Sequence, residues 1–144
     1  MKSAISALAL ATLVAIASLT QAHAQTRTAR VNVPFAFNFG SQHYDAGVYR
    51  IAVNSPSNLA ISDAAKRSTR LTMIESRADS GSSNEPASLT FRKYGNTYFL
   101  AEYSTSGATF NLVESNKERS LSREYAMSQM GSSLVQVAAL EREK

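Results

Sequence analysis

The residue types that most often perform chemistry are scarce in this chain. It contains two histidines and no cysteine, which excludes a thiol nucleophile, a disulfide scaffold and a thiolate metal site. His43 stands two residues before Asp45. A histidine oriented by a carboxylate could act as a general base toward a serine, so a small hydrolase that uses His43 is one interpretation.

The surroundings of His43 argue against this chemistry. The sequence has no G-x-S-x-G turn to present a serine, and one histidine cannot build the usual three-ligand zinc site without recruiting carboxylates. We therefore predict no catalytic residue, no metal site and no cofactor, and a loop position for His43.

The acidic residues could supply a carboxylate pair of the glycosidase type, which requires two facing carboxyl groups. Those in the β-rich sequence are scattered: Glu75, Glu85, Glu102 and Glu114. Alternation places Tyr98, Leu100 and Glu102 on one strand face. An interior position would make Glu102 a buried charge in need of a partner or ligand, but we expect a solvated face or a strand end.

The positive charge does not indicate nucleic acid. The formal net charge is only +4, and its local groups are Lys66, Arg67, Arg70 and Arg77, and then Arg92 and Lys93. Neither group alternates with aromatic residues in the manner of a base-stacking surface. We predict no nucleic-acid partner.

Aromatic residues are the most prominent set. Their positions in β-rich sequence predict a core, although a small barrel could use some of them to line a cavity for an apolar ligand. The set is Phe35, Phe37, Phe39, Tyr49, Phe91, Tyr98, Phe99, Tyr103 and Phe110.

The N-terminus has the features of a secretory signal peptide. Lys2 precedes an uncharged apolar run at residues 4–19, and Ala22-His23-Ala24 gives the small-x-small pattern of a cleavage site. The run is shorter than the roughly 20 residues that a membrane-spanning helix requires. We predict cleavage between Ala24 and Gln25, a single domain at residues 25–144 without a transmembrane helix, and a periplasmic or secreted location. The lack of cysteine favours a bacterial source.

A period of two dominates residues 25–113 and predicts strands. A strand also fits residues 134–140. In the segment 31–39 every second residue is apolar, and Pro34 indicates an edge or a bulge. Gly95-Asn96 predicts a tight hairpin turn. The expected strands are 31–39, 48–53, 59–61, 70–76, 89–93, 98–103, 109–113 and 134–140.

One helix is expected near the C-terminus. Ser115 and Glu118 have the spacing of a capping box, in which the serine accepts from the helix start and the glutamate reaches back. The helix should cover residues 118–130, with Gly131 as the residue that ends it.

These elements predict an all-β, mainly antiparallel fold. About eight short strands with turn signals favour a single sandwich or small barrel with one short helix. An outer-membrane barrel is less favoured, because several expected strands are shorter than the 9–11 residues that a tilted spanning strand requires.

Three segments resemble a group of small secreted bacterial β-rich proteins of uncharacterised function. The segments are VPFAF at 33–37, AGVYRI at 46–51 and YGNTYFL at 94–100. The resemblance implies export and a β-rich fold over residues 31–125, but no catalytic residue. Tyr44-Asp45 stands where that pattern favours Leu-Pro.

The sequence thus favours an exported, non-enzymatic β-domain that binds a partner or contributes to envelope structure. A carrier of a small apolar ligand in an aromatic-lined barrel and a hydrolase using His43 are the alternatives. The ligand-binding residues are unknown at this point.

Export gives a direct test. Protein recovered from the envelope of an expressing bacterium should have a mass that begins at Gln25, as measured by native mass spectrometry. An uncut chain would instead identify the N-terminus as an anchor.

Overall fold

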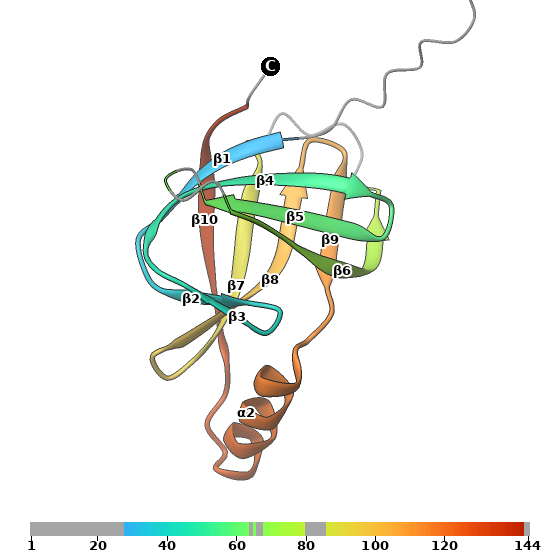
Figure 1. The fold of residues 1–144 in the computed structure, drawn as a ribbon. Coiled ribbons are helices and arrows are strands. Elements are labelled where there is room, and N and C mark those ends of the chain that lie inside the picture. Colours follow the sequence, from blue (N-terminus) through green and yellow to red (C-terminus); the bar gives the residue numbers. More distant parts are fainter. Residues whose placement is uncertain (1–27, 64, 66–67, 80–85, 143–144) are drawn as a thin grey trace, which may run out of the picture.

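A closed barrel of eight strands forms the body of the protein in a computed structural model, which describes residues 28–63, 65, 68–79 and 86–142. The barrel order is β8-β7-β10-β1-β4-β5-β6-β9, and β9 pairs back to β8 (Figure 1). The expected all-β, mainly antiparallel fold is confirmed, in its barrel form. The barrel strands are β1 (Thr28–Val33), β4 (Gly47–Ser55), β5 (Asn58–Asp63), β6 (Thr69–Ala78), β7 (Ser88–Tyr94), β8 (Thr97–Thr105), β9 (Ala108–Leu112) and β10 (Ser133–Arg142).

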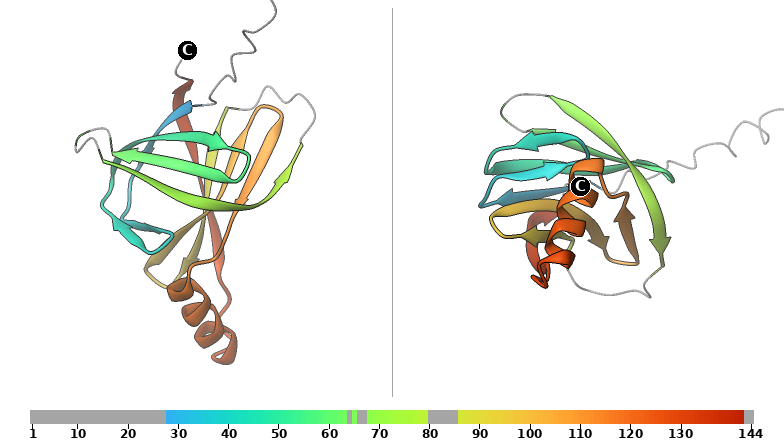
Figure 2. Two further views of the ribbon diagram at one scale, coloured as in Figure 1. Left: turned by 45° about the vertical axis from the view of Figure 1, so that its right-hand side comes forward. Right: turned by 90° about the horizontal axis from the view of Figure 1, so that it is seen from below.

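Two long strands close the barrel by belonging to both of its sheets. β6 pairs with β5 through residues 69–73 and with β9 through residues 74–78. β10 pairs with β7 through residues 133–138 and with β1 through residues 139–142. Each strand therefore changes partner half-way, so that one group of strands crosses the other at a large angle (Figure 2).

A short hairpin covers the lower end of the barrel in Figure 1. It consists of β2 (Phe37–Phe39) and β3 (Gln42–Tyr44), with Gly40 at a φ of 59° in the turn. The expected single strand 31–39 is therefore wrong in detail, because it divides at Pro34, which has no N–H to continue the ladder. β3 was not expected from the sequence.

The aromatic residues form the core, as expected. Phe37 packs edge-on against Tyr49 and Phe91, with ring centroids 5.2 and 5.3 Å apart. Phe35 stacks on Tyr98 at 4.1 Å. These contacts place the rings of Phe35 and Phe37 at the end of the barrel, where they replace water with ring contacts.

A bulge in β8 moves Glu102 off the strand face that simple alternation would have it share with Leu100. Thr90 on β7 lies opposite Glu102, but the next residue, Phe91, lies opposite Leu100, which leaves Ala101 as an extra residue. An extra residue reverses the alternation of the strand. Leu100 consequently belongs to the core, whereas Glu102 is on the other face and half-buried.

The helix α2 (Asn116–Met127) projects below the barrel (Figures 1 and 2). It is shorter than expected and does not end at Gly131. Gln129 has a φ of 54°, and Met130 N–H donates to Tyr125 O while Gln129 N–H donates to Ala126 O. This is a Schellman motif with glutamine in the left-handed position, which ends the helix two residues before the glycine.

In the part of the chain that the structure describes, no helix combines the length and apolar character needed to cross a membrane.

Gln129→Gly should raise the free energy of unfolding by about 1 kcal/mol, because glycine adopts a positive φ without a Cβ penalty. The exposed Gln42 in extended β3 provides the control, since Gln42→Gly should instead lower stability. Urea denaturation measures both, and a loss of stability in Gln129→Gly would contradict the helix end described here.

Candidate functional site

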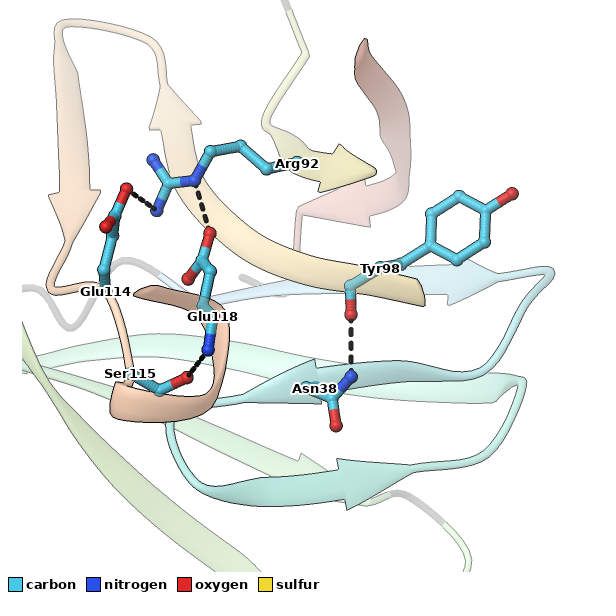
Figure 3. A network of polar contacts seen from close by, with 6 residues as sticks. All are labelled: Asn38, Arg92, Tyr98, Glu114, Ser115 and Glu118. Carbon is cyan, nitrogen blue, oxygen red and sulfur yellow. Dashed lines mark hydrogen bonds and ion pairs between the residues drawn. The ribbon is translucent and has the colours of Figure 1, made fainter. Parts of the chain in front are cut away.

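A buried ion pair attaches α2 to the barrel. Glu118 Oε1 lies 2.5 Å from Arg92 Nε, and their side chains are 3% and 24% exposed. Glu114 Oε1 lies 3.9 Å from Arg92 Nη2 (Figure 3). The network joins the middle of the barrel wall, on β7, to the first turn of the helix.

The expected capping box is confirmed in one half only. Ser115 Oγ accepts from Glu118 N–H at 3.2 Å, as predicted for the helix start. The carboxylate of Glu118 does not reach back toward the cap, because it bonds Arg92. A guanidinium provides a stronger, charge-assisted partner than a backbone N–H.

The pair shifts the titration of both groups. Burial raises the pKa of Glu118, and the hydrogen bond from Arg92 reduces this rise without cancelling it. Burial lowers the pKa of Arg92, but the hydrogen bond and charge of Glu118 raise it by more, so Arg92 remains charged. The short hydrogen bond between Arg92 and Glu118 therefore attaches the helix to the barrel.

Two further contacts hold the helix. Lys117 Nζ donates to Asn38 Oδ1 at 3.3 Å, and Asn38 Nδ2 donates to Tyr98 O at 3.1 Å (Figure 3). Tyr125 packs edge-on against Tyr94, with centroids 5.7 Å apart. α2 is thus fixed at both ends, although most of its surface faces outward.

A groove of about 360 Å³ lies between the start of α2, β6 and the β2–β3 turn. Both of its charged lining residues are engaged, because Lys117 bonds Asn38 and Glu114 lies beside Arg92. The lining residues are Gly40, Ser41, Thr72, Met73, Val113, Glu114, Ser115, Asn116 and Lys117.

The residues that the sequence singled out for acid–base chemistry are dispersed. His43 is exposed on β3, opposite Asn38, rather than in the expected loop. Glu102 accepts from Thr90 Oγ1 and Ser104 Oγ, at 3.3 and 3.0 Å. Among the described residues, no three His, Cys, Asp or Glu side chains gather in a way that could hold a metal ion.

The other acidic candidates do not assemble either. Glu75 is exposed on β6, and Glu114 joins the Arg92 network. Glu85 lies outside the described residues, as do Lys66, Arg67, Ala24 and Gln25.

Two titratable tyrosines, Tyr44 and Tyr49, pack in or against the core. Burial raises the pKa of Tyr44, and burial together with Asp63, Asp45 and Tyr44 raises that of Tyr49 to about 12. The Tyr49 hydroxyl donates to Asp45 O at 2.6 Å. Both phenols therefore stay protonated near neutral pH and act as packing groups.

Two other basic side chains that the sequence singled out make local contacts. Arg77 lies over the Phe110 ring at 5.7 Å and pairs with Asp79, while Lys93 lies over Tyr98 at 5.4 Å. Arg70 is exposed on β6.

A surface feature that the sequence analysis missed lies at the end of α2. Met127, Met130 and Leu134 are 84%, 57% and 70% exposed. We call these three residues the apolar tip. One signal could have found it: residues 125–140 contain no charged side chain, in a chain that is 18% charged.

Comparisons with protein-family models, curated proteins and solved structures gave no match for this chain.

The ion pair predicts an asymmetric response to mutation. Arg92→Met should lower the free energy of unfolding by about 2–3 kcal/mol, because it leaves the carboxylate of Glu118 buried without its partner. Glu118→Gln should cost only about 1 kcal/mol, since the Arg92 side chain is 24% exposed and Glu114 remains 3.9 Å from its Nη2. The double variant Arg92→Met/Glu118→Leu should recover most of the loss. Equal losses in the two single variants would contradict this account.

Acid should rescue Arg92→Met. Without Arg92, the pKa of folded Glu118 rises further above its unfolded value, so the folded state binds the proton more tightly. Stability should therefore increase as pH falls from 7 toward about 4.3, the ordinary carboxyl pKa. Arg92→Met/Glu118→Leu is the control and should lack this increase. A loss of stability over that range, relative to the control, would contradict the assignment.

Proposed function

We propose that this chain is an exported, non-enzymatic protein that binds a protein partner through the apolar tip. The observation that carries the proposal is the exposure of three large apolar side chains within residues 127–134. Such side chains favour burial when a partner is present. Methionine is well suited to contact, because its unbranched thioether adapts to different surfaces.

The attachment of α2 supports the same function. Eight of the twelve helix residues are exposed, and Glu118 is its only buried residue. A helix with so little core contact gains its position from the Arg92 pair and the Tyr94 contact. These contacts hold Met127, at the helix end of the apolar tip, in a fixed place, which lowers the entropy lost on binding.

The chemistry of the acidic groups supports a non-enzymatic role. Glu118 and Glu102 both have structural partners. The signal features of Lys2, residues 4–19 and Ala22-His23-Ala24 support export to the periplasm or beyond.

The aromatic cluster is the feature that a small-molecule carrier would use. Its rings contact one another, and Phe37 and Phe91 are both 0% exposed. A ligand would have to displace these contacts. The exposed apolar tip requires no such rearrangement, and we therefore favour the protein partner.

Photo-crosslinking in the producing bacterium tests this proposal. A photoreactive amino acid at position 130 should give a discrete heavier species, and one at position 73 should not. Met73 is a matched control because it is also a methionine and is 64% exposed. In the same cells, Met127→Ser with Leu134→Ser should reduce the species at least tenfold. Equal labelling at positions 73 and 130 would contradict the proposal.

A further inference from the structure

The first half of β10 has an unpaired edge. Ala139 N–H donates to Ala87 O, which directs the main chain of Ala139 toward the β7 side. Main-chain groups alternate in direction along a strand, and residues 133–138 keep an unbroken register with β7. Leu134 and Gln136 therefore direct their N–H and C=O groups away from β7.

No described strand takes up these groups. β1 pairs with β10 only from Ala139 onward. The packing reflects this gap: Val135 and Val137 are half-buried, whereas Leu89 and Phe91, which face them on β7, are 0% exposed. One more strand on this edge would complete both the hydrogen bonds and the burial of the two valines.

The edge also lacks the usual protection. Exposed edges commonly carry lysine, proline or a bulge, which prevent pairing with another chain. Residues 125–140 contain no charged residue and no proline. β6 differs, because its exposed segments carry Arg70, Glu75 and Arg77. The free edge of β3 is only three residues long.

We infer that the occupant of the β10 edge is a second copy of this chain, paired antiparallel about a two-fold axis at Val135. Leu134 then lies opposite Gln136 of the second copy, so that about four main-chain hydrogen bonds form. A neutral segment does not repel itself, whereas a partner selected by charge would require a charged edge. An isologous contact of this kind closes as a dimer. This inference rests on the proposed function, since it names the partner of the surface that includes Leu134.

Disulfide trapping tests the register, because the chain has no cysteine of its own. In the inferred dimer, Val135 lies at the two-fold axis as a non-hydrogen-bonded pair, with Cα atoms about 4.5 Å apart. Val135→Cys should therefore form an intermolecular disulfide. Val137→Cys is the matched control, since it has the same residue type, strand and face, but its two copies would be about 14 Å apart. Equal trapping of the two variants would overturn the inferred register.

Sedimentation equilibrium tests the dimer itself. Protein purified from an expressing bacterium should show a monomer–dimer equilibrium between about 1 µM and 1 mM, as suits a small contact. Gln136→Lys should raise the dissociation constant at least tenfold, and Gln42→Lys, the same change on exposed β3, should leave it unchanged. A monomer throughout, or a dimer unaffected by Gln136→Lys, would overturn the inference.

The two proposals fail in different ways. A monomer that still gives the crosslinked species at position 130 with a different protein overturns the self-pairing but leaves the proposed function standing. A monomer with no specific species at position 130 contradicts both.

Discussion

The structure depends on two strands that each serve two sheets. β6 and β10 exchange partners half-way along their length, and this exchange converts two sets of strands into one closed barrel. Closure removes most of the edges that a small sheet would expose. It also has a cost, because a strand that has a neighbour on one side only keeps unpaired main-chain groups on its other side. In β10 this applies to residues 133–138, which pair with β7 but are not yet joined by β1.

The closed barrel then determines what the rest of the chain does. Its lower end is filled by the rings of the 33–39 segment, so packing supplies the stability that disulfides provide in many small domains. The helix is left outside, and the Arg92–Glu118 pair gives it a defined position. Met127 and Met130 of the proposed binding surface therefore lie outside the barrel, whereas Leu134 belongs to barrel strand β10.

Much of this architecture could be predicted from the sequence. The period of two located every barrel strand, although it did not separate β1 from β2. Gly95-Asn96 correctly marked the hairpin turn, and Ser115 correctly marked the helix cap. The features that the sequence did not predict depend on contacts between residues far apart in the chain. The extra residue at Ala101 depends on how β8 meets β7, and the partner of Glu118 is an arginine 26 residues away. The unpaired edge of β10 depends on where β1 leaves it, which is after Val31, and no local pattern specifies that point.

The measurement that tests the central claim most directly is residue-resolved amide hydrogen exchange along β10 at low protein concentration. The account predicts that the amides of Leu134 and Gln136 exchange much faster than those of Val135 and Val137, which face β7. Equal and strong protection of all four amides in dilute protein would contradict it, because the edge would then already be paired within a single chain.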